Sequence, residues 1–453
     1  MEILINKYIW GLPLLFSLLA VGLVLSIKTR FIHIRYLPRI PKLLFQKNSD
    51  DPKGVSSFSS TMILLGSHIG VGNIIGVSLA IMMGGPGSIF WMWISGITLS
   101  ILSFFENTLG QIYQEEINNT YKGGVAYYIY HGLNAKIYSK IIALVLFISI
   151  GLLMPMVQSS TIIASFNNTF GFSKLIISVV LALFVGYLLF GKGDKFVDAI
   201  NLMVPFMACI FVLLSTIIIF INFAQIDDVI YLIFNSAFNK NSYYGGLIGV
   251  AFSYGLRRGA FSNEAGMGTA PSITSQGKAE HPVSQGIISS FCVFVDTVFL
   301  CSLTAFMILL TGKYNVILDD YYLRYSVSGD YNQFLDHALN TITMNNGALV
   351  VTILIFFFAF TSMIGSFFNA QSNLYFIFKG KHKKSLSNLT FLYKILFIGL
   401  ILIAGYVNTN FSWQIADLGL GLIGWVNLFV IVLLSKDVFA SIKDYKEQIE
   451  RKK

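Results

Sequence analysis

The chain has 453 residues, of which 55% are apolar and only 12% are charged, whereas soluble domains carry about 25% charged residues. This composition excludes a chain that is solvated mainly by water. The formal net charge of +9 would also suit a nucleic-acid partner. A basic face on anionic lipid explains the charge equally well and also fits the apolar composition. We therefore expect a lipid bilayer as the partner and do not expect a nucleic acid.

Stretches long enough to cross a bilayer recur along the whole chain. A spanning helix needs about 20 mostly apolar residues, because no water is present to satisfy the backbone. The sequence therefore predicts an all-α integral membrane protein, with eleven transmembrane helices in one domain, 1–453. The expected spans are 8–27, 56–83, 88–111, 139–168, 173–190, 196–222, 244–270, 284–312, 346–378, 387–407 and 413–435.

Positive charge marks alternate loops. Basic residues follow the first span, from Lys28 to Lys53, and the last span, from Lys436 to Lys453; they also follow the third, fifth, seventh and ninth spans. By the positive-inside rule these loops are cytoplasmic. We therefore expect a multi-pass protein of the cell membrane with an odd number of spans, its N-terminus outside and its C-terminus in the cytoplasm.

The second span contains a segment that suits a helix poorly. It reads Gly66-Ser-His-Ile-Gly-Val-Gly-Asn73, and each glycine costs about 1 kcal/mol relative to alanine inside a helix. Non-helical backbone is tolerated within a membrane only where it lines a cavity or is buried in protein. In transporters such a break presents N–H groups to a substrate carboxylate and carbonyls to a cation. The alternative is close helix packing through small residues.

The seventh span contains a second candidate interruption, at Ala251-Phe-Ser-Tyr-Gly255 and in the residues that follow up to Gly268. The second and seventh spans run in opposite directions, which is typical of an inverted five-plus-five repeat. The two halves show no visible sequence similarity, so the repeat rests on spacing and orientation. The predicted organisation is an extra first helix with a basic loop (1–54), a first repeat (55–222), a second repeat (228–435) and a basic tail (436–453).

Ionisable residues inside predicted spans are costly and indicate function by default. Snorkelling or an arginine–carboxylate pair is an adequate structural explanation for Arg258, Glu264 and Asp296. His68 lies at mid-depth in the interrupted segment, where it is expected to bond substrate or backbone, or to titrate in proton coupling. The full set is His68, Glu106, Asp198, Arg257, Arg258, Glu264 and Asp296.

Thr361 and Ser362 are adjacent hydroxyl residues in the phenylalanine-rich ninth span. Each can simply bond to the preceding turn of its own helix. Together with carbonyls freed by a broken helix, the two hydroxyls can instead complete an all-oxygen site for a hard monovalent cation.

Several motifs resemble the alanine or glycine:cation symporter family, and the resemblance covers residues 55–435. It implies the inverted-repeat fold of the leucine-transporter type (APC superfamily), coupling to Na⁺ or H⁺, and a small neutral amino acid as substrate, with no enzymatic step. The motifs are Asn73-Ile-Ile-Gly-Val, Gly84-Gly-Pro-Gly87 with Phe90-Trp-Met-Trp93, Arg258-Gly-Ala-Phe-Ser-Asn-Glu-Ala-Gly266, His281-Pro-Val-Ser-Gln-Gly286 and Val293-Phe-Val-Asp-Thr297.

The same resemblance implies two sets of site residues. The coupling Na⁺ would be held by the carbonyls of Gly66, Ile69 and Phe358 and by the hydroxyls of Thr361 and Ser362. The substrate pocket would place Gly70, Gly72 and Asn73 at the substrate carboxylate. Its full set is His68, Gly70, Gly72, Asn73, Gln158, Phe252, Ser253 and Ser366.

Two positions depart from the family pattern. His68 stands where threonine or another residue is commoner, and Ser366 stands where a tryptophan bordering the pocket is expected. Because tryptophan fills a large buried area, its loss would enlarge the pocket, so glutamine joins alanine and glycine as a candidate substrate.

The sequence thus favours a sodium-coupled symporter that imports a small neutral amino acid, and the alternative is a proton-coupled amino acid symporter. Three other classes are disfavoured. The sequence has no Gly-x-x-x-x-Gly-Lys-Ser/Thr loop for ATP, no filter motif of an ion channel and no His-Glu-x-x-His helix of a membrane metalloprotease.

Overall fold

The chain is mainly helical in the computed structural model, which describes residues 9–45, 55–117, 119–191, 195–238, 245–277, 279–318, 321–380, 382–407 and 409–451. Lys53 and Lys453, which end the two basic segments, lie outside the described residues. A helix or helix pair occupies each predicted span: α2 (Leu12–Lys28), α5 (Ser57–His68) with α6 (Ile75–Gly84), α7 (Ser88–Ile112), α9 (Lys136–Ile148) with α10 (Met154–Phe170), α11 (Lys174–Phe190), α12 (Lys195–Ile221), α14 (Gly245–Asn263) with α15 (Ala270–Thr274), α16 (Pro282–Val293) with α17 (Cys301–Thr311), α19 (Gly347–Ile377), α20 (Lys383–Ala404) and α21 (Thr409–Leu433).

Shorter elements join the long helices. Two antiparallel hairpins pair β1 (Glu115–Ile117) with β2 (Thr120–Lys122) and β3 (Val316–Leu318) with β4 (Tyr321–Arg324). The remaining α-helices are α3 (Ile32–Arg35), α4 (Ile40–Leu44), α8 (Val125–Gly132), α13 (Ile226–Phe238), α18 (Phe334–Asn340) and the C-terminal α22 (Ser435–Arg451). Turns of 3-10 helix lie at Leu37–Arg39, Val71–Asn73, Phe223–Gln225 and Tyr331–Gln333. Turns of π-helix lie at Ser149–Leu153 and Phe294–Leu300.

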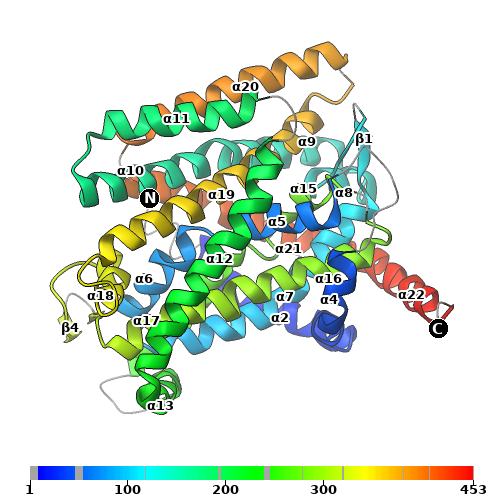
Figure 1. Cartoon of the computed structure of the whole chain (residues 1–453). Helices are drawn as coiled ribbons and strands as arrows, with labels where there is room; N and C mark the ends of the chain where they lie inside the picture. The colour runs from blue at the N-terminus through cyan, green and yellow to red at the C-terminus, as the bar shows by residue number, and fades with distance from the viewer. Residues whose placement is uncertain are drawn as a thin grey trace.

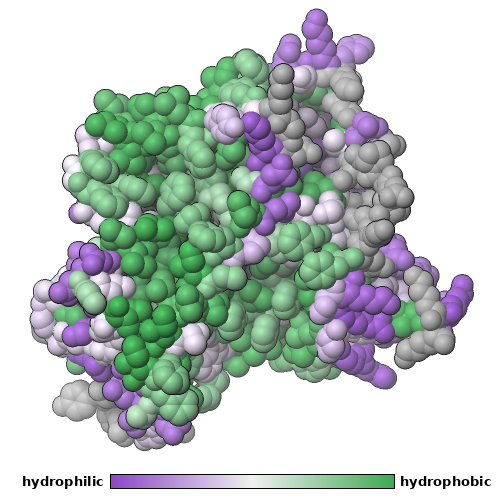
Figure 2. All heavy atoms as spheres, viewed as in Figure 1, coloured by the Kyte–Doolittle hydropathy of each residue, from purple (hydrophilic) through white to green (hydrophobic). Residues whose placement is uncertain are grey.

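The described part of the chain contains six helices long and apolar enough to cross a membrane, or up to nine spans if each of three bent pairs forms one. The expected count of eleven therefore stays a prediction. Most long helices run from left to right in Figure 1, and α12 crosses them steeply. Figure 2 shows apolar side chains over the middle of this face and hydrophilic residues towards its right-hand side and lower left. A wide apolar belt of this kind suits contact with lipid.

The second interruption lies in the last part of the interval that the sequence predicts, 251–268. α14 is continuous from Gly245 to Asn263, so the first part of that interval, 251–255, holds no break. The helix ends just before Glu264, and Gly266 and Gly268 then adopt positive φ angles of 81° and 73°. Glycine tolerates this backbone conformation best, so these two glycines, rather than Gly255, mark the break.

A buried carboxylate fixes where this break forms. Glu106 of α7 is completely buried and accepts hydrogen bonds from the N–H groups of Gly266 (3.2 Å) and Gly268 (2.9 Å). Asn427 of α21 donates to the same carboxylate at 2.7 Å and to the Gly266 carbonyl at 2.8 Å. Backbone groups released from a helix must find partners when water is absent, and these side chains supply them.

α5 and α19 approach each other closely at one glycine. A Cβ added at Gly365 of α19 would lie 2.5 Å from Ser67 Cβ and 3.0 Å from Ser67 Cα. No side chain fits in that space without moving a backbone, so a small residue here permits the contact.

Gly365→Ala should therefore push α19 away from α5 and lower thermal stability. Overpacking a tight contact costs about 1–3 kcal/mol, which is measurable as a lower unfolding temperature in detergent. Gly399→Ala in α20 is the matched control, because a Cβ there would meet nothing within 4 Å. Equal unfolding temperatures for the two variants would contradict this account of the contact.

Candidate functional site

The first interruption separates α5 from α6. α5 ends at His68, and a single 3-10 turn from Val71 to Asn73 precedes α6. The two halves of the span are bent by 55° relative to each other, so the predicted break in the second span is confirmed. Within the turn, the N–H groups of Asn73 and Ile74 bond to the carbonyls of Gly70 and Val71, each at 3.2 Å.

Asn73 holds this break in shape. Its side-chain oxygen accepts the Gly70 N–H at 2.9 Å, and its amide nitrogen donates to Asp296 Oδ1 at 2.7 Å. Thr304 Oγ1 donates to the Asn73 carbonyl at 2.8 Å. Both ends of the buried amide are thus used inside the protein, and contact with a substrate carboxylate would require one of these bonds to open.

The five residues expected to bind a cation lie along the contact between α5 and α19. Ser362 Oγ is 3.2 Å from the Gly66 carbonyl oxygen and 3.5 Å from that of Ile69. Thr361 Oγ1 bonds to the Phe358 carbonyl of its own helix at 3.1 Å. Thr361 therefore bonds to the preceding turn of its own helix, which is the simpler of the two predicted roles, whereas the Ser362 hydroxyl contacts the broken helix. Carbonyl and hydroxyl oxygens are the ligand types that hard cations prefer.

Gln158 of α10 approaches the same break. A Cβ added at Gly70 would lie 2.7 Å from Ser362 Oγ and 3.7 Å from Gln158 Nε2, so three elements meet at Gly70. Gln158 is only 4% exposed, and its Oε1 has no hydrogen-bond partner among the described residues. A buried amide oxygen without a partner is costly, and it is suited to accept a hydrogen bond from a bound ammonium group.

The other predicted substrate contacts on α5, the turn and α19 have different surroundings. His68 is buried, and within the described ranges both its ring nitrogens lack a partner. Ser366 Oγ donates to the Ser362 carbonyl at 3.0 Å. Gly72 faces α14 instead, where its added Cβ would lie 3.7 Å from Ser262 Cα.

Phe252 and Ser253 lie at neither break. Both are in the continuous part of α14, and the Phe252 ring centroid is 5.1 Å from that of Phe16 and 4.9 Å from that of Trp91. Their expected place in the pocket followed from the family resemblance, with the position of the second break left open within 251–268. The α14 residues beside the first break are Phe261 and Ser262.

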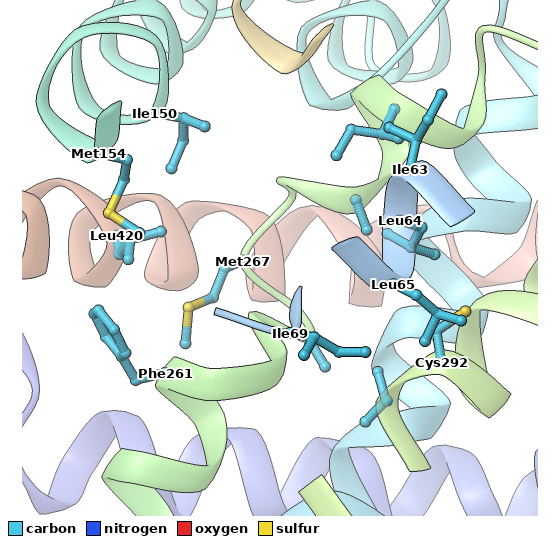
Figure 3. Packing of buried hydrophobic residues seen from close by; sticks show 14 of the residues in the cluster. Ile63, Leu64, Leu65, Ile69, Ile150, Met154, Phe261, Met267, Cys292 and Leu420 are labelled. Atoms are coloured by element: carbon cyan, nitrogen blue, oxygen red, sulfur yellow. The ribbon is translucent and has the colours of Figure 1, made fainter. Parts of the chain in front are cut away.

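Side chains from both breaks share one apolar cluster. Figure 3 shows Met267 of the second break between Ile69 of the first break and Phe261, with Leu420 of α21 and Met154 of α10 on the same side as Phe261. The cluster excludes water from the surroundings of the polar groups, so their hydrogen bonds act in a low-dielectric environment.

Asp296 joins the first break to the end of α14. It is completely buried in the π-helical turn Phe294–Leu300. Its carboxylate accepts hydrogen bonds from Asn73 Nδ2 at 2.7 Å, Ser262 Oγ at 2.8 Å and Thr297 Oγ1 at 2.8 Å. Because these three uncharged donors satisfy the Asp296 carboxylate, an arginine–carboxylate pair does not explain its burial. The carboxylate and hydroxyl oxygens form a second cluster with cation-ligand chemistry, which the sequence pattern alone did not single out.

A multi-pass helical protein in which polar groups meet at a helix broken within the membrane has the organisation of secondary transporters. Residues 2–453 match the model of the sodium:alanine symporter family, and the chain belongs to this family. Its members are transporters, so the protein is a membrane symporter of the amino-acid type and not an enzyme.

Curated relatives align with nearly the whole chain. It is 39% identical to YrbD of Bacillus subtilis (strain 168), which is named as a sodium/proton-dependent alanine carrier, over 98% of this chain and 92% of the relative. It is 34% identical to GlnT of the same organism, named as a sodium/glutamine symporter, over 98% and 90%. The sodium/alanine symporter AgcS of Methanococcus maripaludis is 31% identical, over 98% and 96%.

Asn73→Ala should destabilise the first break and abolish amino acid uptake. The substitution leaves the Gly70 N–H and an Asp296 oxygen unpaired, at about 1–3 kcal/mol each, so the unfolding temperature should fall. Asn167→Ala, which removes an exposed bond to the Phe172 carbonyl, is the matched control. Normal uptake by Asn73→Ala would show that the break serves packing alone.

Proposed function

We propose that this protein is a sodium-coupled symporter that imports a small neutral amino acid by alternating access. The observation that carries the proposal is the meeting of Gly70, Gln158 and Ser362 at the broken helix. Na⁺ binds between α5 and α19 and orders the break, the amino acid then binds beside it, and one bundle of helices rocks against the other. No covalent chemistry takes part.

The proposed Na⁺ ligands are the carbonyls of Gly66, Ile69 and Phe358 and the hydroxyls of Thr361 and Ser362. Ser362 supports this assignment, because its hydroxyl already lies within 3.5 Å of the Gly66 and Ile69 oxygens. In the described residues no group of three histidine, cysteine or acidic side chains is arranged to hold a metal ion, so a site built from carbonyls and hydroxyls is the one that we propose.

The proposed substrate binds at Gly70, Gly72 and Gln158. Backbone N–H groups at the break bind its carboxylate, and the unpaired Gln158 Oε1 accepts a hydrogen bond from its ammonium group. Alanine and glycine are the first candidates. Glutamine is the third, because a small Ser366 stands where the family resemblance leads us to expect a tryptophan and because the relative GlnT is named as a sodium/glutamine symporter.

The proposed architecture is an inverted five-plus-five repeat of the leucine-transporter type, preceded by one extra helix, with repeats at 55–222 and 228–435. The N-terminus is outside. The face that carries the β1–β2 hairpin and α22 is cytoplasmic, since the basic tail follows the last long helix.

Proton coupling is the alternative. The ring of His68 supports it, because both nitrogens lack partners among the described residues, and YrbD is named as sodium/proton-dependent. In proteoliposomes at one fixed pH, uptake of alanine, glycine and glutamine is compared with Na⁺ present and with Na⁺ replaced by a large organic cation. Loss of amino acid accumulation without Na⁺ supports sodium coupling, whereas undiminished accumulation would contradict sodium coupling.

Thr361→Ala combined with Ser362→Ala should raise the Na⁺ concentration for half-maximal uptake at least several-fold, because two of five proposed ligands are lost. Protein yield and unfolding temperature should change much less. Thr216→Ala is the control, since this exposed hydroxyl bonds to the Val212 carbonyl of its own helix. Equal Na⁺ dependence in the double variant and the parent would refute these ligands.

A further inference from the structure

Lys122 is a buried lysine at the end of β2, outside the proposed membrane spans. It is only 3% exposed. Its ammonium nitrogen donates to Gln276 Oε1 at 3.2 Å and to Gln371 Oε1 at 3.0 Å. The nitrogen also lies 5.3 Å from the ring centroid of Tyr375. Two amide oxygens and an aromatic face are weak compensation for a charge removed from water.

Among the residues that the structure describes, no acidic side chain pairs with the charge of Lys122. Glu115 lies opposite it in the β1–β2 hairpin, but the Glu115 carboxylate is bound by Lys379 of α19 and His131 of α8. α19 also contributes Tyr375, and α15 contributes no ionisable residue. Burial lowers the pKa of Lys122 from its ordinary value to about 7, because the charged form loses its hydration.

The two partners of Lys122 belong to the moving parts of the proposed transporter. Gln276 follows α15, which continues the chain beyond the second break, and its Nε2 donates to the Phe368 carbonyl of α19 at 3.0 Å. Gln371 lies on α19, the helix that carries the proposed cation ligands. The hairpin is itself tied to α19, since Ser372 Oγ donates to the Gly123 carbonyl at 2.7 Å. Lys122 therefore bridges α15 and α19 at the hairpin face.

We propose that Lys122 is a proton-sensitive latch that holds the end of α15 against α19, and that it must release before the substrate leaves towards the hairpin face. This inference rests on the proposed function. The neutral amine suits the buried position, whereas the protonated amine is stabilised by water. Acid at the hairpin face therefore opens the latch, and alkali favours the closed arrangement. Lys122 is a positioning residue, because it acts through α15 and α19 and not on the substrate.

The test varies the pH inside proteoliposomes, at the hairpin face of correctly oriented protein, while the outside pH and the Na⁺ gradient stay fixed. Between pH 8 and pH 6 the protonated fraction of a group with a pKa of about 7 rises from roughly one tenth to nine tenths. Alanine uptake by the parent protein should rise several-fold over this range. Lys122→Met lacks both bridging hydrogen bonds and cannot titrate, so its uptake should no longer depend on the internal pH, and Lys122→Arg, which is always charged, should stay fast.

Lys140→Met is the control, since it removes an exposed lysine at the same predicted face and should keep the parent's pH profile. A folded Lys122→Met or Lys122→Arg variant with the parent's profile would overturn the latch. If neither variant folds, hydrogen–deuterium exchange of residues 270–277 in the parent decides, because unchanged protection at pH 6 and pH 8, after correction for intrinsic rates, also overturns it. A parent protein that accumulates no amino acid contradicts the proposed function instead.

Discussion

Everything in this structure depends on how main-chain groups are satisfied where a helix stops inside the membrane. Hydrocarbon offers no water to an unpaired N–H or carbonyl, so each interruption must find partners within the protein or in a ligand. Glu106 does this for Gly266 and Gly268, and Asn73 does it for Gly70. One long-range contact and one local side-chain contact thus permit two breaks that lipid alone would forbid.

The two breaks differ in what they leave unsatisfied. In the second, Glu106 and Asn427 bind the released groups of Gly266 and Gly268, and a single buried side-chain atom of the break, Thr269 Oγ1, lacks a partner among the described residues. The first leaves buried polar groups beside it, namely Gln158 Oε1 and the His68 ring, without partners in the described part of the chain. Because such groups are costly unless something binds them, the first break is the better place for a ligand, and the second is a structural joint.

Local chemistry in the sequence predicts part of this arrangement. The glycines and polar residues of 66–73 are improbable in a lipid-facing helix, and this local signal located the first break correctly. The second break was predicted only to lie within 251–268, whereas the structure has it at 264–269, because glycine permits a break without requiring one. What decides the position is Glu106, which lies 160 residues from Gly266 in the chain. The Asp296 contacts were missed for the same reason, since Asn73 is 223 residues away.

The proposed Na⁺ and substrate positions are close enough to influence each other through one hydroxyl. Ser362 now donates towards the carbonyls of Gly66 and Ile69, so a cation that binds those oxygens must turn the hydroxyl proton away and take its oxygen as a ligand. The same hydroxyl oxygen would lie only 2.7 Å from a Cβ added at Gly70, so it is next to the proposed substrate. In the proposed mechanism, bound Na⁺ therefore changes what the amino acid meets at Gly70. By thermodynamic linkage the amino acid must change the affinity for Na⁺ by the same factor, which is the coupling that symport requires.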